Sequence, residues 1–291
     1  TFVAVQFVPG DPIMAMLSDQ SGDEVLEARL RADYGLDRPL IVQFVDYLRN
    51  ILNGTFGLSF RYAQTPVSEV IADGLLITPI LALVSITIAI ALGVVLGVFA
   101  AVRRNTWADT AVILALVTSI SVPNFAMAAF LVYIFAIQLD LVPVAGWGRI
   151  DQMILPVAIL VIPPTAYIAR LTRTYMLEVL NRDYIRTAKA KGLRNHLVVY
   201  RHALRNTLVP LLTTIGIIFG GLLSGTFVVE AIFHVPGLGR LAIDSIFARD
   251  YPVTMTIVLL FTVFYSLINL AVDLAYAALD PRIRLTGGRG T

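Results

Sequence analysis

The chain has 291 residues, of which 57% are hydrophobic and 14% are charged. An ordinary soluble domain carries about 25% charged residues. This composition, with a mean hydropathy of +0.80, therefore excludes a water-soluble fold and intrinsic disorder. A net charge of +2, without long runs of like charge, argues against a nucleic-acid partner. Because the chain has no cysteine, it has no disulfide, thiolate nucleophile or cysteine-based metal site.

Apolar stretches predict an all-α polytopic membrane protein with six transmembrane helices. Residues 1–8 are apolar and run into Pro9-Gly10-Asp11-Pro12, which ends a helix. The chain starts at Thr1, so we interpret 1–8 as the end of a first transmembrane helix that begins upstream. A spanning helix needs about 20 apolar residues. Five further stretches reach or approach this length: Leu75–Val102, Thr110–Leu139, Gln152–Ala169, Thr207–Val229 and Tyr251–Val272.

These spans divide the chain into four predicted parts. Residues 1–8 end the first transmembrane helix, and residues 9–74 form an extracytoplasmic helical cap. Residues 75–279 form a five-helix transmembrane core with a cytoplasmic loop at 170–206, and residues 280–291 form a tail. This topology puts 14 of the 22 basic residues but only 5 of the 20 acidic residues on the side of the loop. Because basic residues favour the cytoplasm, both termini are predicted to be cytoplasmic.

The predicted cap has its own helix signals. Ser21 and Glu24 fit a capping box, and the helix that follows is expected to end at Tyr34-Gly35. A second helix opens at Pro39, ends at Asn53-Gly54 and carries apolar residues on one face, namely Ile41, Phe44, Val45 and Leu48. Two roles stay open for the cap: a lid over the ends of the spans, or a docking and gating element.

The loop at 170–206 is amphipathic, and Gly192 is expected to separate two helices. On the first helix Tyr184, Ala188 and Lys191 share one face, whereas Arg186 and Lys189 point elsewhere. One interpretation is a surface helix held to acidic lipid. The other is a docking helix for a cytosolic partner.

Few residues within the predicted spans could carry chemistry. Only Asp273 is charged, and we expect it to snorkel or to pair with an arginine of the loop. The three histidines lack metal-ligand spacing, and the chain has no phosphate-binding P-loop and no nucleophile-elbow motif. The sequence thus predicts no catalytic residue and no metal site, and it disfavours a proton-driven transporter and a membrane enzyme.

Small and polar residues are the remaining features of the spans. Three GxxxG pairs, at Gly93/Gly97, Gly216/Gly220 and Gly221/Gly225, predict close helix packing. Uncharged polar side chains cluster near prolines in the spans and suit a pathway that passes polar solutes through weak contacts. The alternative is that they bond neighbouring helices together. The candidate pathway residues are Ser119, Ser121, Asn124, Thr165, Thr213, Thr214 and Ser224.

The stretch from Asp183 to Leu193, with His202–Asn206 and Pro210, resembles the signature loop of the integral membrane permease subunits of ATP-binding-cassette (ABC) importers, in the dipeptide and oligopeptide branch. Arg186-Thr187-Ala188 stands where the family has Glu-Ala-Ala, and Gly192 matches. His202–Arg205 replaces Ile-x-Leu-Pro. Both departures are usual in the peptide branch. Further stretches similar to the family are Val8–Pro12, Tyr34–Pro39, Pro236–Arg240, Arg249–Val253 and Asp280–Arg284.

The resemblance implies a type I ABC importer permease fold in the bacterial inner membrane. Such a subunit forms half of a translocation pathway for di- or oligopeptides. Its partners would be a second homologous permease subunit, two ABC ATPase subunits, an extracytoplasmic substrate-binding protein and the lipid bilayer. The chain would hold no cofactor, because ATP and magnesium bind to the ATPase subunits. Nickel, glutathione, opines or sugars are alternative solutes, and an ion-coupled secondary transporter is an alternative class.

The resemblance also implies two sets of site residues. A coupling helix would contact the ATPase through Tyr184, Arg186, Thr187, Ala188, Lys189, Lys191 and Gly192. We expect Gly192 to be the most sensitive of these positions. A contact with the binding protein, or an outer gate, would involve Pro236, Gly237, Leu238 and Gly239.

Overall fold

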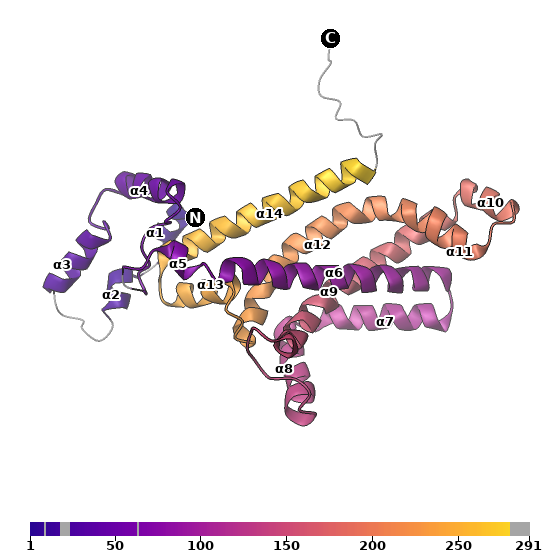
Figure 1. Cartoon of the computed structure of the whole chain (residues 1–291), viewed down its shortest axis with the longest axis horizontal. Helices are drawn as coiled ribbons and strands as arrows, with labels where there is room; N and C mark the ends of the chain where they lie inside the picture. Colours follow the sequence, from indigo (N-terminus) through magenta and orange to yellow (C-terminus); the bar gives the residue numbers. More distant parts are fainter. Residues whose placement is uncertain (9, 18–23, 63, 280–291) are drawn as a thin grey trace, which may run out of the picture. The chain divides into compact units, whose positions relative to one another are not determined.

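The computed structural model describes residues 1–8, 10–17, 24–62 and 64–279 (Figure 1). The side chains of Ala15, Ser224 and residues 276–279 lie outside this description, as do the predicted tail at 280–291 and Ser21 of the predicted capping box. The described chain is helical without a named strand, as the all-α prediction requires. It divides into two compact units, residues 1–79 with 234–264 and residues 80–233 with the chain from 265 onward.

Four long helices are apolar enough to cross a membrane. They are α6 (Gly74–Val102), α9 (Ile150–Leu180), α12 (Arg205–Ile232) and α14 (Tyr251–Leu279). Each contains one of the predicted spans. The internal prolines of α6, α9 and α12 are tolerated, so these helices stay continuous.

Helix α9 differs from its prediction at its C-terminal end. The span was expected to stop at Ala169, but the helix continues through Arg170 and Arg173 to Leu180. The first turns of the 170–206 segment thus belong to α9. A span predicted from hydropathy ends at the first charged residues. The helical hydrogen bonding of the backbone, in contrast, continues until Asn181 ends the helix.

The predicted span Thr110–Leu139 is not a single helix. It consists of α7 (Trp107–Ser121), α8 (Asn124–Leu131) and the π-helix η1 (Val132–Gln138), and the chain bends by 103° at the break between α7 and α8. Pro123 explains the bend, because a proline disfavours helical backbone in the residue before it. Val122 accordingly has extended backbone angles (φ −92°, ψ 121°).

The first unit contains the predicted cap. A short helix, α1 (Phe2–Gln6), stands where the end of the first transmembrane helix was predicted. It is followed by α2 (Pro12–Met16), α3 (Glu24–Asp33), α4 (Leu40–Leu52) and α5 (Val67–Val70). Arg31 of α3 is hydrogen-bonded to Glu27 and to Asp11, the N-cap of α2. These bonds raise the pKa of Arg31 above its ordinary value.

A buried carboxylate holds the first unit together. Asp250 accepts hydrogen bonds from the hydroxyl of Ser59 and from the amides of Phe60 and Arg61, at 3.1 and 3.2 Å for the amides. Its backbone carbonyl also accepts the amide of Thr254 at the start of α14. One residue thus caps a membrane helix and fixes a loop 190 positions away in the chain.

In the second unit, two of the three predicted GxxxG pairs mediate close helix contacts. A Cβ atom on Gly97 would lie 2.5 Å from the carbonyl oxygen of Ala169, so α6 and α9 approach closely there. Gly216 and Gly220 lie against side chains of α14, those of Val272 and Tyr265. A Cβ on Gly221, in contrast, would meet no described atom within 4 Å. The third pair, Gly221/Gly225, therefore leaves one side of α12 open in this chain.

Acidic residues in the helices differ from the prediction. Asp273 of α14 is exposed, and among the described residues it forms no ion pair with an arginine of the 170–206 segment. Glu230 lies in α12 and is fully buried. Glu230 is part of this helix because α12 continues three residues beyond the predicted end of the span at Val229.

Candidate functional site

The candidate coupling element is the short helix α10 (Asp183–Ala190). Its C-terminal end forms a Schellman motif, in which the amide of Gly192 donates to the carbonyl of Lys189 (3.0 Å) and the amide of Leu193 to that of Ala188 (3.3 Å). Gly192 has a φ of +76°, a conformation that costs an L-residue energy but suits glycine. The predicted role of Gly192 as a helix break is confirmed.

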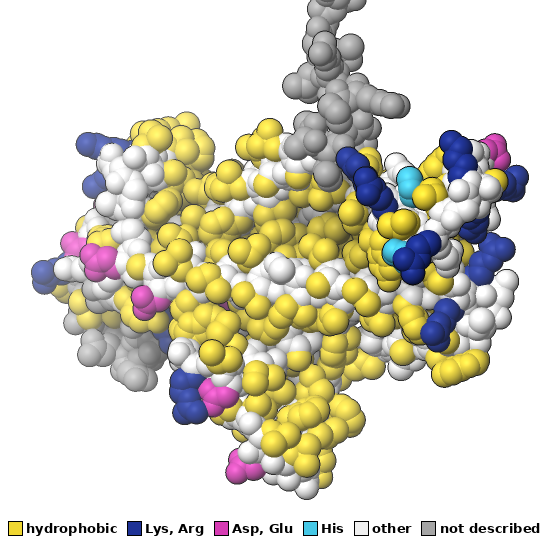
Figure 2. Space-filling model, turned by 45° about the vertical axis from the view of Figure 1, so that its right-hand side comes forward, with side chains coloured by type: hydrophobic (Ala, Val, Ile, Leu, Met, Phe, Trp, Pro, Cys, Tyr) yellow, Lys and Arg dark blue, Asp and Glu magenta, His cyan; other side chains and the backbone are white. Residues whose placement is uncertain are grey.

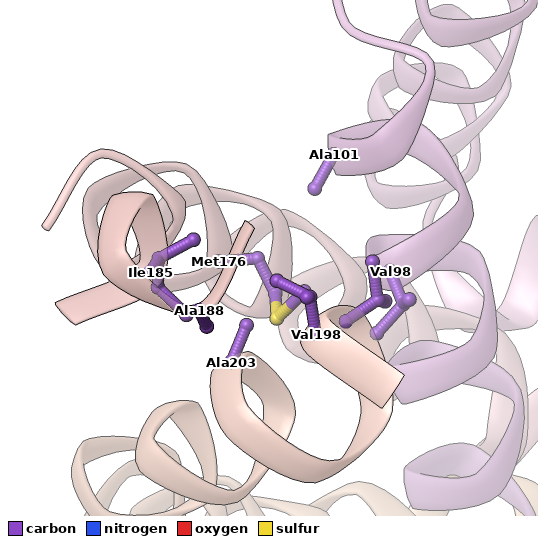
Figure 3. Packing of buried hydrophobic residues seen from close by; sticks show 8 residues of the cluster. Val98, Ala101, Met176, Ile185, Ala188, Val198 and Ala203 are labelled. Carbon is purple, nitrogen blue, oxygen red and sulfur yellow. The ribbon is translucent and has the colours of Figure 1, made fainter. Parts of the chain in front are cut away.

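One face of α10 is buried in its own chain. Ile185 is 0% exposed and Ala188 is 8% exposed. Both belong to a hydrophobic cluster in which Figure 3 shows side chains converging from separate helices. The cluster comprises Val98, Ala101, Met176, Ile185, Ala188, Val198, Val199 and Ala203. Ala188 therefore packs within this chain, which differs from its predicted role as a contact with an ATPase.

The rest of α10, with Lys191 directly after it, is exposed and largely basic. Tyr184, Arg186, Thr187, Lys189 and Lys191 are all exposed. Figure 2 shows Lys, Arg and His side chains gathered over the segment that carries α10. The ion pair between Arg186 and Asp183 is exposed on both sides and contributes little stability. Such a face is free to bind an acidic or polar surface.

The segment after α10 leads directly into a membrane helix. The short α11 (Asn195–Leu197) and the π-helix η2 (Val198–Leu204) continue into α12. Asn206, near the start of α12, donates from Nδ2 to the hydroxyl of Tyr184 on α10 at 3.2 Å. This bond and the hydrophobic cluster join α10 to α12 and α9.

A buried ion pair stiffens the same unit. Arg173 of α9 donates from Nε to Oδ1 of Asp109 and from Nη2 to Oδ2, with both distances at 2.7 Å. The Asp109 side chain is 6% exposed, and it also accepts the amide of Asn105 at 3.1 Å. Two-point pairs of this kind fix orientation as well as distance. The pair thereby fixes the start of α7 against α9.

The predicted pathway residues occupy different environments. Ser119 and Ser121 donate to carbonyls one turn back in α7 (2.8 and 2.9 Å), and Asn124 follows the break after Pro123. A Cβ on Gly225 would lie 4.0 Å from Nδ2 of Asn124, so the break approaches α12 near Ser224, whose side chain is not described.

Three further predicted pathway residues lie on α9 and α12. Thr213 is exposed and Thr214 is half-buried on α12. Thr165 differs from the prediction, because it is buried in α9, where that helix packs against Gly93 of α6. A residue in this helix contact does not line a pathway.

The predicted outer-gate residues lie in the first unit and are mostly covered. Only Pro236 is exposed, whereas Gly237, Leu238 and Gly239 are buried. The amide of Leu238 donates to the hydroxyl of Thr78 at 2.8 Å, and a Cβ on Gly74 would lie 2.8 Å from that same amide. The loop therefore joins the start of α13 (Leu238–Phe247) to the start of α6. Three of the four predicted residues are therefore buried at this contact between the start of α13 and the start of α6.

A comparison with protein families identifies the chain. The model of the binding-protein-dependent transport system inner membrane component matches residues 93–285. The chain belongs to this family. It is therefore a permease subunit of an ABC importer, a transport component rather than an enzyme, and a multi-pass protein of the inner membrane.

Relatives of this permease extend over almost its full length. The dipeptide transport system permease protein DppB of Bacillus subtilis is 43% identical, over 98% of this chain and 92% of its own. The glutathione transport system permease protein GsiC of Salmonella typhimurium is also 43% identical, over 97% and 92%. A putative peptide transport system permease protein of Brucella abortus is 41% identical, over 98% and 92%.

Solved structures agree with the type I importer permease fold. A chain of the MetNI methionine ABC transporter, in an inward-facing conformation, matches with a TM-score of 0.64 and 19% identity, covering 73% of this permease and 97% of that chain. A chain of an amino acid ABC transporter matches with a TM-score of 0.56 and 18% identity, covering 72% and 94%. At these identities the likeness concerns the fold alone.

Sequence reasoning missed three acidic residues that the permease structure buries: Asp109, Glu230 and Asp250. Asp109 carried a signal, because Thr106 and Asp109 have the spacing of a capping box. Asp250 lies directly before a predicted span, where a helix N-cap is expected. Their partners lie far away in the chain, so the sequence alone did not show them.

Proposed function

We propose that this permease forms half of the translocation pathway of an importer for di- or oligopeptides and that α10 couples it to the ATPase subunits. The supporting observation is the two-sided nature of α10. Its apolar side is packed through Ile185 into the permease, while its basic side is exposed. The exposed side of such a helix can bind a cytosolic partner, and its packed side can transmit the resulting displacement to the membrane helices.

Coupling would proceed by rigid-body motion. ATP and magnesium would bind to the two ABC ATPase subunits, and closure of that pair would displace α10. The hydrogen bond from Asn206 to Tyr184 would carry the displacement to α12, and the cluster around Met176 would carry it to α9. Because packed helices move as units, the displacement would rock the spans rather than bend them locally.

The orientation follows from the charges. With α10 in the cytoplasm, 14 of the 22 basic residues lie on the inner side. Both termini would then be cytoplasmic, and residues 9–74 would form an extracytoplasmic cap. The basic residues of α10 would meet acidic or polar residues of the ATPase surface.

The pathway would lie between this permease and a second homologous subunit. The break between α7 and α8 and the open side of α12 at Gly221 are the candidate lining, with Ser119, Ser121, Asn124, Thr213, Thr214 and Ser224 as the polar groups. Uncharged polar groups suit passage of a solute without tight binding. A substrate-binding protein would deliver the solute to the cap, where Pro236 is the exposed member of the predicted contact.

The solute class rests on the relatives. DppB is named for dipeptides, whereas GsiC, equally similar, is named for glutathione. Glutathione is a tripeptide, so both names indicate a short peptide. Uptake of labelled dipeptide into proteoliposomes that hold the complete importer, with unlabelled dipeptide, tripeptide or glutathione as competitor, separates the two candidates.

Coupling through α10 is tested in the same proteoliposomes by charge reversal. We expect Lys189→Glu to lower uptake for each ATP hydrolysed, because it places like charges at the proposed contact. Arg104→Glu, another exposed basic position in the same unit, serves as the control and should leave this ratio unchanged. Equal ratios for both variants and the native protein would reject α10 as the coupling element.

A further inference from the structure

Helix α4 turns its polar side toward its own chain. The side-chain amide of Gln43 donates to the carbonyls of Arg38 (2.8 Å) and Leu36 (3.3 Å). Asp46 accepts a hydrogen bond from Arg38 at 3.1 Å. In a soluble domain the apolar side of a helix faces its own protein and the polar side faces water. In α4 this arrangement is reversed.

The apolar side of α4 is exposed. It is formed by Leu40, Ile41, Phe44, Val45, Leu48 and Leu52, with exposed fractions from 42% for Phe44 and Leu48 to 86% for Leu52. These side chains carry neither charge nor hydrogen-bonding groups. A contiguous apolar patch of this kind marks a surface that contacts a membrane or another protein.

Within the first unit, α4 contacts α1 and lines a cavity together with the first turns of α14. Phe2 of α1 packs on Phe44 and Tyr47, with ring centroids 5.3 and 5.8 Å apart. A cavity of about 800 Å³ is lined by Phe2 and Tyr47 and also by Tyr251 and Met255 from the first turns of α14. Because α14 is long and apolar enough to span a membrane, α4 lies at the level where that span begins.

We propose that α4 is an interfacial helix whose apolar side inserts into the outer leaflet of the bilayer, where lipid acyl chains cover it. This inference rests on the proposed function, because it takes the cap to be extracytoplasmic. Lipid is favoured over a protein partner because protein interfaces carry a polar rim with hydrogen bonds. The polar groups Gln43 and Asp46 are instead directed to the cap itself. Amphipathic helices bind membrane surfaces in this geometry.

Site-directed spin labelling tests the proposal, because the chain contains no native cysteine. The complete importer is reconstituted in lipid nanodiscs with Val45→Cys, Leu48→Cys or Leu52→Cys, each spin-labelled. Arg49→Cys, at an exposed basic position that borders the apolar side of the same helix, is the matched control. Collision rates are measured with oxygen, which concentrates in lipid, and with a water-soluble nickel chelate.

We expect oxygen collisions to exceed nickel collisions several-fold at positions 45, 48 and 52 and the reverse at position 49. Higher nickel accessibility at all four positions would place α4 in water and overturn the proposal. Low accessibility to both reagents at 45, 48 and 52 would mean a protein contact and would also overturn it. If this protection appears only when the binding protein is added, the binding protein covers the patch.

Transport by the same variants separates this inference from the proposed function. ATP-driven uptake with nickel-accessible labels would leave the permease function intact and reject only the interfacial placement. Absence of binding-protein-dependent uptake by the importer that holds the native permease would reject the proposed function itself.

Discussion

Arg173 of α9 and Asp109 of α7 are joined by two hydrogen bonds of 2.7 Å across 64 positions of the chain. The pair lies in the unit that contains α10. A buried ion pair that loses one partner leaves an uncompensated charge. The contact therefore makes the packing of α7 on α9 depend on both residues at once.

The first prediction concerns this pair. We expect Asp109→Ala to lower the free energy of unfolding by less than the about 3–5 kcal/mol of a fully buried pair, because the guanidinium of Arg173 loses its counter-ion but is 25% exposed to solvent. The double variant Asp109→Leu/Arg173→Met should lose much less, because it removes both charges. Thermal unfolding of the purified importer in detergent measures both. Equal losses in the two variants would contradict the prediction.

The second prediction concerns Gly192. A side chain there meets no described atom within 4 Å, so the cost of substitution is backbone strain of about 1–2 kcal/mol. We expect Gly192→Leu to uncouple ATP hydrolysis from uptake without unfolding the spans. Gly192→Asn is the control, since asparagine tolerates this backbone conformation better. Full transport by Gly192→Leu would show that the helix end is dispensable.

The third prediction separates the two faces of α10. Ile185→Ala removes a fully buried side chain and should cost about 2–5 kcal/mol of stability, with lower uptake per ATP hydrolysed. Thr187→Ala, on the exposed face, should change stability by less than about 0.5 kcal/mol. Unfolding and uptake are measured on the same preparations. A stable Ile185→Ala variant would mean that the buried face does not hold α10.

The fourth prediction concerns the GxxxG pairs. Gly97→Ala places a methyl group 2.5 Å from the carbonyl oxygen of Ala169, and we expect a loss of about 1–3 kcal/mol from the forced separation of α6 and α9. Gly221→Ala has open space and should not destabilise the isolated subunit. If Gly221 faces the second permease subunit, that variant should weaken assembly instead. Size-exclusion chromatography and thermal unfolding distinguish these effects.

The fifth prediction concerns Asp250. Removing its carboxylate in Asp250→Ala leaves the buried donors Ser59 and Phe60 without an acceptor, at about 1–3 kcal/mol for each unsatisfied group. Hydrogen exchange of the amides of Phe60 and Arg61 should accelerate. Asp37→Ala, at an exposed acid of the same unit, should leave that exchange unchanged. Unaltered exchange in Asp250→Ala would show that the loop is held by other contacts.

Much of the fold was predictable, because the composition of about 20 neighbouring residues determines where a membrane span lies. Four apolar stretches became long helices at nearly the predicted positions, and the αL glycine at 192 ended α10 as expected. The bend at Pro123 was less predictable. Seven prolines lie in the predicted spans, and only this one breaks a helix, because Pro252 stands in the first turn of α14 and the other five are accommodated in continuous helical backbone.

The candidate site was predictable only in part. The segment from Asp183 to Gly192 was found from its motif, but periodicity did not show which face is buried. Ala188 packs inward and Lys189 points outward, since Met176 of α9 and Val198 of η2 supply the apolar surface that α10 covers. Leu238 is likewise buried at the start of α6 rather than exposed at a gate.

The sequence by itself determined the membrane class, most of the apolar helices, the family and the position of α10, because hydropathy, charge and short motifs are properties of neighbouring residues. Only the tertiary structure decided the partner of Asp109, the buried side of α10 and the exposed apolar side of α4. These features depend on which surfaces meet after folding, and residues that meet are separated by tens to hundreds of positions in the chain.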